Sequence, residues 1–164
     1  MLLYIPGEED PVEALYDRYA DMLYRVALSM LKNREDAEDA VQSVFEKYVL
    51  HPHLFLSAEH EKAWMLRVTI NQCRDALRRR SQRAALPLDE VAGTGVWDHH
   101  SEVLDVLQRL PEEYRLPLTL YYFEDCTIEE IARTMQLGLS AVKMRLQRGR
   151  AMLRKELKGD DCHA

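Results

Sequence analysis

The sequence predicts an all-α fold of two small helical domains joined by a linker, the C-terminal one containing a helix-turn-helix. Apolar residues recur at steps of three and four through most of the chain, which indicates amphipathic helices. Glycine and proline are scarce, at six each in 164 residues, whereas sheet folds need many turns. One aperiodic stretch interrupts the pattern. We expect an N-terminal domain over residues 1–83, a linker over 84–100 and a C-terminal domain over 101–164.

Three helices are expected in the N-terminal domain. The first begins at Asp10 and Pro11, because aspartate is a favoured N-cap and proline a favoured first residue of a helix. The second carries several carboxylates in its first turn, where they complement the helix dipole, and Pro52 ends it. After a loop, the third runs from about Ala58 to Gln82.

Four helices are expected in the C-terminal domain. The first begins after Ser101, a candidate N-cap, and is stopped by Pro111. The second runs from Tyr114 to Phe123 and holds a proline at a kink or in its first turn. The third covers Ile128 to Met135, and the last covers about Ser140 to Leu157.

The last two helices and the short turn between them predict a helix-turn-helix. Thr127 and Glu130 form a capping box at its start. The residues expected to be buried are Ile128, Ile131, Ala132, Leu137, Val142, Leu146 and Leu153. The residues expected on the opposite face are Lys143, Met144, Gln147, Arg148, Arg150 and Arg154. Gln and Arg hydrogen-bond base edges, so this face favours DNA binding over a merely solvated basic surface.

The net charge of −6 is unevenly distributed. Residues 1–61 hold thirteen acidic and five basic side chains. Residues 67–83 hold six basic and one acidic, and residues 143–158 hold seven basic and one acidic. An acidic segment followed by two basic ones predicts two kinds of partner.

Several classes of protein are disfavoured. Three distant cysteines without a CxxC pair favour a reducing cytoplasm, and no secretory signal or membrane-spanning apolar run is expected. A metal site would have to be built from Cys162 and the histidines. The histidines are His51, His53, His60, His99, His100 and His163. Their spacings match no closed zinc pattern. We expect no cofactor, no metal and no catalysis.

The segment IARTMQLGLSAVKMRLQRGR, residues 131–150, resembles the helix-turn-helix with which bacterial sigma factors read the promoter −35 element. Two positions depart from the family pattern: Gln136 stands where glycine is usual, and Gly138 stands where a serine-like N-cap is usual. Upstream, Leu110, Pro111 and Arg115 match the L-P-x-x-x-R that often precedes this motif. The resemblance implies −35 contacts by Ser140, Lys143, Met144, Gln147, Arg148 and Arg150.

The segment DAEDAVQSVFEKYV, residues 36–49, is similar to the sigma-factor signature of the helix that binds core RNA polymerase. In that family the helix docks on the coiled-coil clamp helices of the largest polymerase subunit. The resemblance implies core-polymerase contacts by Asp36, Asp39, Gln42, Phe45 and Glu46. A solvated acidic helix face is the alternative.

The segment KAWMLRVTINQCRDALRRR, residues 62–80, is similar to the family's −10-reading helix. In the family this helix and the loop before it also hold the unpaired strand, and a cationic groove beside a base-capturing loop suits that task. The resemblance implies contacts by Asn71, Gln72, Arg74, Arg78 and Arg79, with the loop from Leu54 to His60. Trp64 is favoured as a core residue rather than a stacking platform.

The resemblance covers about Val12 to Arg83 and Glu102 to Lys158, and its length is that of the short extracytoplasmic-function (ECF) type. It implies a promoter-specificity subunit that binds core polymerase, reads duplex and single-stranded promoter DNA, assists melting, and is restrained by an anti-sigma factor. The alternative is a one-component helix-turn-helix regulator that acts as a dimer on a palindrome.

Overall fold

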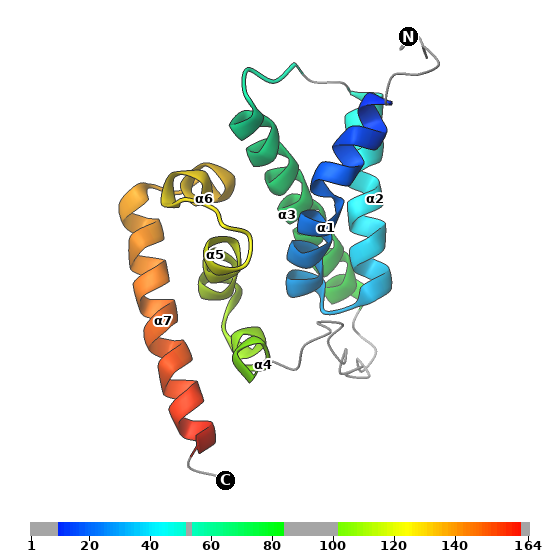
Figure 1. Cartoon of the computed structure of the whole chain (residues 1–164). Coiled ribbons are helices and arrows are strands. Elements are labelled where there is room, and N and C mark those ends of the chain that lie inside the picture. Colours follow the sequence, from blue (N-terminus) through cyan, green and yellow to red (C-terminus); the bar gives the residue numbers. More distant parts are fainter. Residues whose placement is uncertain (1–9, 52–53, 84–101, 162–164) are drawn as a thin grey trace.

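The fold is entirely helical in the part of the chain that this computed structural model describes, namely residues 10–51, 54–83 and 102–161. The helices are α1 (Pro11–Leu31), α2 (Arg34–Leu50), α3 (Ala58–Arg83), α4 (Glu102–Arg109), α5 (Glu112–Tyr122), α6 (Ile128–Met135) and α7 (Leu139–Asp161). Figure 1 shows two groups: α1–α3 form one bundle, and α4–α7 form a second in which α5 and α6 face the first and α7 lies outermost. The all-helical prediction is confirmed.

Side-chain caps explain where the first three helices begin. Asp10 Oδ1 accepts a hydrogen bond from Val12 N at 2.9 Å, which confirms the predicted N-cap of α1. Asn33 Oδ1 accepts from Asp36 N at 2.9 Å, which caps α2 after a connection of only two residues from α1. At α3, Ser57 Oγ accepts from the backbone N–H of His60 at 3.1 Å.

The C-terminal helices follow the predicted order, with shifted ends. The range of α6 agrees with the prediction, whereas α7 extends four residues beyond Leu157. Helix α5 begins at Glu112 instead of Tyr114, because the Pro111 carbonyl already accepts from Arg115 N at 2.9 Å. Pro117 is therefore the sixth residue of the helix, which leaves the interior position as the one of the two expected alternatives that fits. The proposed cap Ser101 and the 84–100 linker lie outside the described residues.

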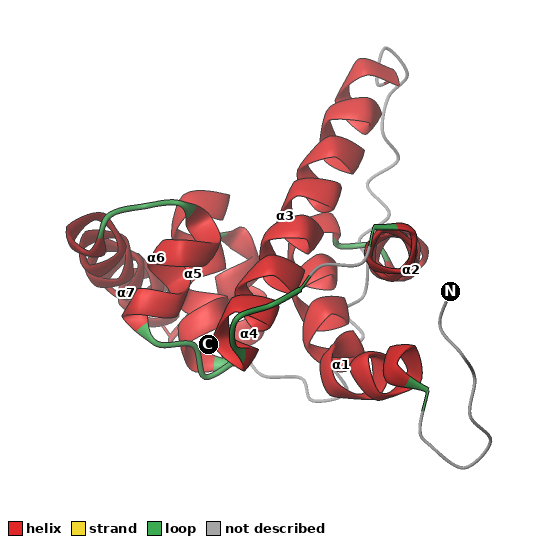
Figure 2. Cartoon of the chain, turned by 90° about the horizontal axis from the view of Figure 1, so that it is seen from above, coloured by secondary structure: helices red, strands yellow, loops and turns green. Residues whose placement is uncertain are grey.

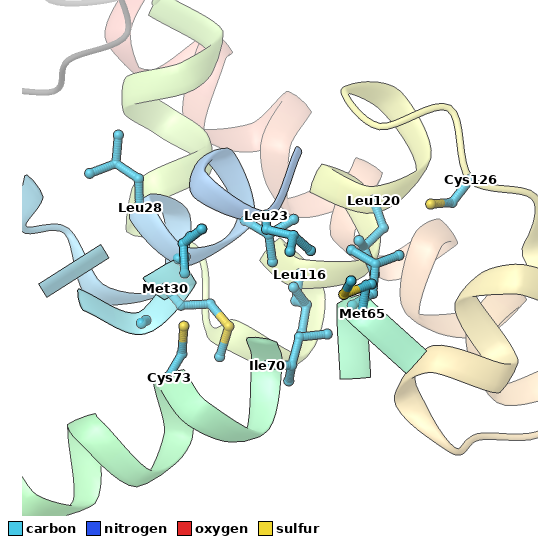
Figure 3. Packing of buried hydrophobic residues seen from close by; sticks show 14 of the residues in the cluster. Leu23, Leu28, Met30, Met65, Ile70, Cys73, Leu116, Leu120 and Cys126 are labelled. Atoms are coloured by element: carbon cyan, nitrogen blue, oxygen red, sulfur yellow. The ribbon is translucent and has the colours of Figure 1, made fainter. Parts of the chain in front are cut away.

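The two groups of helices share one buried apolar cluster. In the first group it includes Leu23 of α1, with Met65 and Ile70 of α3. In the second it includes Leu116 and Leu120 of α5, and Figure 3 shows these five side chains gathered in one place. Helix α1 packs on α5 and α3 packs on α6. Viewed from above, α3 lies between α2 on one side and α5–α7 on the other (Figure 2).

Candidate nucleic-acid interface

Helices α6 and α7 form a helix-turn-helix whose start carries the predicted capping box. Thr127 Oγ1 accepts from Glu130 N at 3.1 Å, and Glu130 Oε2 accepts from Thr127 N at 2.7 Å. Both reciprocal bonds of the motif are present, so two N–H groups at the start of α6 have partners. This prediction is confirmed.

The turn between the two helices places the first departure from the family pattern at a position where the backbone favours glycine. Gln136 ends α6 at φ 55°, ψ 47°, the left-handed region that favours glycine. The next residue, Leu137, donates its N–H to the Ala132 carbonyl at 2.9 Å and closes the helix. The Gly138 carbonyl accepts from Val142 N at 3.1 Å, which makes Gly138 the N-cap of α7 without a capping side chain.

Helix α7 separates an apolar face from a polar one. Val142 and Leu146 are fully buried, as predicted. Five of the six residues proposed for −35 contacts are exposed, namely Ser140, Lys143, Met144, Gln147 and Arg148. Because α7 lies outermost, its exposed face meets solvent and not another helix (Figure 1). The structure therefore brings these five side chains together on one accessible surface.

Arg150 lies apart from that surface. Its Nε donates to Tyr122 Oη at 2.7 Å, and its guanidinium carbon is 5.7 and 5.8 Å from the ring centroids of Tyr121 and Tyr122. With Val103, Leu107 and Arg154, among others, Arg150 lines a mainly apolar groove of about 430 Å³ between α4, α5 and α7. This geometry fits a side chain held by aromatic stacking better than one that reads a base edge.

A glycine in α7 allows the helix to approach α5 closely. A Cβ atom added at Gly149 would lie 2.8 Å from Leu118 Cδ1, 3.3 Å from Leu118 Cγ and 3.4 Å from Tyr114 Cβ. Leu118 is buried, so it has little room to move. The orientation of the exposed face of α7 therefore depends on a close approach to α5 at Gly149, where an added Cβ would require Leu118 to shift.

Arg115 supports the motif from inside the domain. It is 8% exposed, and its Nη1 donates to the carbonyls of Gln108 at 3.2 Å and Leu110 at 3.1 Å. Burial lowers the pKa of this guanidinium, which nevertheless stays charged. The arginine therefore satisfies carbonyls at the end of α4. The spacing from Leu110 to Arg115 was the available signal, but the sequence does not reveal this partner.

The proposed polymerase-binding residues of α2 are only partly surface groups. Asp39, Gln42 and Glu46 are exposed along one side of the helix. Asp36 forms an ion pair with Arg80 of α3. Phe45 is 7% exposed and packs on Tyr16, with ring centroids 4.9 Å apart, so its contribution there is to packing.

The proposed −10 residues of α3 are partly engaged inside the molecule. Asn71 and Arg79 are exposed. Gln72 Oε1 accepts from Lys47 Nζ at 2.7 Å. Two of the arginines have carboxylate partners, since both Nε and Nη2 of Arg74 lie 3.2 Å from Glu112 Oε1, and Arg78 lies 3.4 Å from Asp75.

The loop before α3 combines an anchored aromatic ring with exposed leucines. Phe55 stacks 6.2 Å from Tyr48 and lies 5.7 Å from Trp64, as measured between ring centroids. Trp64 is half-buried in this cluster, in line with the expected core role. Leu54 and Leu56 on either side of Phe55 are almost fully exposed. Sequence reasoning placed the loop but gave no signal for this exposure.

The described thiols are buried and protonated. Burial raises the pKa of Cys73 to about 12 and that of Cys126 to about 11. Thiols so poorly ionised are weak nucleophiles and metal ligands. Among residues 10–51, 54–83 and 102–161, no group of three His, Cys, Asp or Glu side chains is placed to hold a metal. Of the candidate ligands, only His51 and His60 are described, and both are exposed.

Comparison with known proteins matches both halves of the chain to one family. The family model of Sigma-70 region 2 matches residues 15–83, and that of Sigma-70 region 4 matches residues 100–153. SigV of Bacillus subtilis is 30% identical over 142 residues, which cover 84% of this chain and 86% of SigV. The chain belongs to the ECF-type RNA polymerase sigma factors. It directs RNA polymerase to promoters through regions 2 and 4.

Two further relatives agree in length and fold. SigW of Bacillus subtilis, an ECF sigma factor, is 26% identical over 172 residues, covering 93% of this chain and 91% of SigW. A crystal structure of the sigma factor RpoE with the anti-sigma factor NepR, from Bartonella quintana, has a similar fold. Its TM-score is 0.76 at 20% identity, covering 89% of this chain and 96% of RpoE.

Family membership decides between the readings of the sequence. The region 2 match excludes an N-terminal ligand sensor, and with it the one-component regulator. Sigma factors are not enzymes, so the expectation of no catalysis is confirmed by the family. No helix within the described part of this sigma factor is long and apolar enough to cross a membrane.

Proposed function

We propose that three surfaces of this sigma factor divide its work: α2 binds core polymerase, α3 with its preceding loop reads and holds the −10 element, and the outer face of α7 reads the −35 element. The observation that carries the proposal is the exposed basic face of α7 on a capped helix-turn-helix. Lys143 and Arg148 neutralise phosphates or bind bases, and Gln147 hydrogen-bonds a base edge. Arg150 positions the helix through Tyr121 and Tyr122.

The acidic side of α2 is proposed as the contact with the clamp helices of the largest polymerase subunit. Asp39, Gln42 and Glu46 are exposed there, whereas Asp36 is already paired and Phe45 is buried. Asp39 and Gln42 therefore carry the contact together with Glu46. Asp36 and Phe45 hold the helix in place.

Charge reversal on α2 tests this assignment. Asp39→Lys with Gln42→Lys replaces an acidic and a polar group of the proposed contact with two cations. Affinity for core polymerase should therefore fall about 100-fold, which corresponds to about 2.7 kcal/mol. Asp17→Lys is the control, a charge reversal at an exposed position of α1. Equal affinity of the double variant and the wild type in a core-binding titration would reject α2 as the docking surface.

The region around α3 is proposed to open and hold the promoter. Captured unstacked bases offset the cost of unpairing. Asn71, Arg78 and Arg79 are exposed and therefore available to contact the DNA backbone. The loop with Leu54 and Leu56 supplies apolar surface next to them. Permanganate reactivity of promoter thymines measures melting. Unchanged reactivity after Asn71→Ala with Arg79→Ala would reject this role.

We also propose that an anti-sigma factor restrains this chain in the cytoplasm, where RNA polymerase acts. The similar RpoE structure was solved with such a partner, and the apolar groove between α4, α5 and α7 is uncovered among the described residues. A genuine partner must lower both core-polymerase binding and promoter transcription when titrated in. A partner that binds and leaves both unchanged does not have this role.

A further inference from the structure

One residue of the proposed −10 surface is held by a side chain from a neighbouring helix. Lys47 Nζ of α2 donates to Gln72 Oε1 of α3 at 2.7 Å. The two helices pack together, and α2 lies on the side of α3 that faces away from α5–α7 (Figure 2). Gln72 is half-buried and Lys47 is exposed. The contact therefore lies at the edge between the packed part of α3 and its accessible surface.

The chemistry of lysine determines which end of the Gln72 amide is held. A lysine ammonium carries three N–H donors and no acceptor. A glutamine amide carries an acceptor oxygen at one end and two N–H donors at the other. An amide turned by half a rotation would bring its donors against the ammonium, where no hydrogen bond forms. Lys47 therefore selects the orientation in which Oε1 faces α2.

The nitrogen end of the same amide stays available. Gln72 Nε2 donates no hydrogen bond to residues 10–51, 54–83 or 102–161. It is also not one of the buried polar atoms that lack a partner, so it reaches solvent. Its neighbour along the chain, Asn71, is exposed. Gln72 therefore presents N–H donors beside a residue proposed to contact DNA.

Lys47 is well placed to keep this orientation. It lies in the last turn of α2, where the helix dipole favours a cation. Its carbonyl accepts from His51 N at 2.9 Å, which fixes its backbone at the helix end. In the described part of the chain, no carboxylate pairs with Lys47. Its ammonium is therefore not drawn away from Gln72 by a competing charge.

We propose that Lys47 is a positioning residue that sets base specificity: it fixes Gln72 as a hydrogen-bond donor, so that the base read by Gln72 must offer an acceptor. The inference rests on the proposed role of α3 in reading the −10 element. Guanine O6 and thymine O4 are acceptors, whereas adenine N6 and cytosine N4 are donors at the corresponding places. Gln72 should therefore favour the keto bases guanine and thymine over the amino bases adenine and cytosine.

Gln147 of α7 provides a contrast within the same molecule. It is exposed, and it has no hydrogen-bond partner among the residues that the structure describes. Its amide is free to turn either end to a base, or both ends to an adenine. The two glutamines should therefore differ in preference, because only Gln72 has a lysine at its oxygen.

Substitution of Lys47 by glutamate tests the proposal, because a carboxylate accepts from Nε2 and turns Oε1 outward. Base preference is measured by holoenzyme transcription of a promoter library randomised over the −10 element, with each promoter linked to a transcribed barcode. The wild type should prefer keto bases about tenfold at one position, and Lys47→Glu should prefer amino bases there by about the same factor. Lys47→Leu, which neither donates nor accepts, should bring the ratio to about one.

The same library separates positioning from a direct phosphate contact. If Lys47 only neutralised a phosphate, its replacement would weaken transcription about equally on every sequence. Lys47→Glu with an unchanged base ratio would overturn the proposal, however large the uniform loss. Arg34→Glu is the control, because it reverses an exposed charge at the opposite end of α2 and should leave the ratio unchanged. A reversed preference in a variant that still transcribes cannot come from loss of folding.

Nuclear magnetic resonance of the free chain tests the contact without DNA. The side-chain carbonyl ¹³C signal of Gln72 should move in Lys47→Leu, because its oxygen loses a charged donor. The corresponding signal of Gln147 should stay in place. A Gln72 signal that does not move would show that the amide is not held, and the proposal would be wrong.

A further variant separates failure of this inference from failure of the proposed function. Gln72→Glu carries only acceptors and should favour amino bases even with Lys47 in place. Suppose that Asn71→Ala with Arg79→Ala lowers promoter melting, while no variant of Lys47 or Gln72 changes the base ratio. Then α3 still acts at the −10 element and the inference fails. If none of these variants alters melting or −10 preference, the proposed role of α3 itself fails.

Discussion

Helices α3 and α7 are the two long basic helices of the molecule, and they use their charge differently. Lys143 and Arg148 of α7 have no ion-pair partner within the described ranges. In α3, Arg74, Arg78 and Arg80 each face a carboxylate. The sequence counts give the two segments nearly equal net charge. The comparison shows that charge available for DNA depends on partners contributed by other helices, and α7 has more of it.

The buried faces of the two helices also differ. Helix α3 packs through larger side chains such as Met65 and Ile70, and through Cys73. Helix α7 buries Val142 and Leu146, and it approaches α5 with the bare backbone of Gly149. A helix that approaches its neighbour through glycine accepts added volume only if the neighbour shifts. We therefore expect α7 to be the less tolerant of the two at its packing face and the more exposed at its reading face.

The largest expected effect tests the difference in available charge. Lys143→Ala with Arg148→Ala should lower run-off transcription from a −35-dependent promoter about 100-fold, since each lost contact costs about 1–3 kcal/mol. Arg78→Ala with Arg79→Ala on α3 should lower it less, because Arg78 is already shared with Asp75. An equal or larger loss from the α3 pair would break the comparison.

The next effect concerns the packing of α7. Gly149→Val should lower the free energy of unfolding by about 2 kcal/mol, because the added atoms collide with Leu118 and Tyr114. Gly159→Val is the matched control on the same helix, since a Cβ there meets nothing within 4 Å. Urea unfolding followed by circular dichroism measures both. A harmless Gly149→Val would show that α5 can move aside.

A pH titration probes the packing of α3 through Cys73. Its folded pKa, about 12, lies above the ordinary value of 9.0, so the folded state holds the proton more tightly. The resulting stability is complete below pH 9 and is lost as the pH rises towards 12, at about 1.4 kcal/mol per pH unit. The difference in unfolding free energy between wild type and Cys73→Ala should shrink over this window. A constant difference would mean that the thiol is hydrated.

The smallest effect concerns the entrance to α7. Gln136→Gly should raise the free energy of unfolding by about 0.5 kcal/mol, because relief of the left-handed backbone exceeds the added entropy of the unfolded chain. Gln42→Gly, at an exposed position inside α2, should instead lower it by about 1 kcal/mol. Thermal melts measure the sign of the change in the free energy of unfolding for each variant. A lower free energy of unfolding for both variants would contradict the turn geometry.

Local features of the fold could be predicted from the sequence. Asp10 and Thr127 cap their helices through residues two or three positions away, and such short-range bonds leave a fixed spacing. The polar face of α7 followed from helical periodicity for the same reason. These features depend only on residues that are close along the chain, so they can be predicted from a single sequence.

Long-range partners could not be predicted. Arg74 meets Glu112 and Asp36 meets Arg80 only because helices far apart in sequence pack together. Arg150 looked like a reading residue by spacing, but Tyr122 draws it towards α5. Nothing in the periodicity separates a charge that faces solvent from one that faces a neighbouring helix, so a candidate site cannot be assigned from spacing alone at such positions.

At the end of α1, the residue that would relax the backbone differs from the residue that can bond to the other group of helices. Lys32 adopts φ 55°, ψ 25°, a conformation that costs most residues about 1–2 kcal/mol and glycine almost nothing. Its long side chain, however, crosses to the Gln108 carbonyl in the other half of the molecule. If selection acted only on the backbone conformation at the end of α1, glycine would be favoured at this position. The hydrogen bond from Lys32 Nζ to the Gln108 carbonyl would then be lost. A lysine retained here would instead reveal selection on communication between the halves.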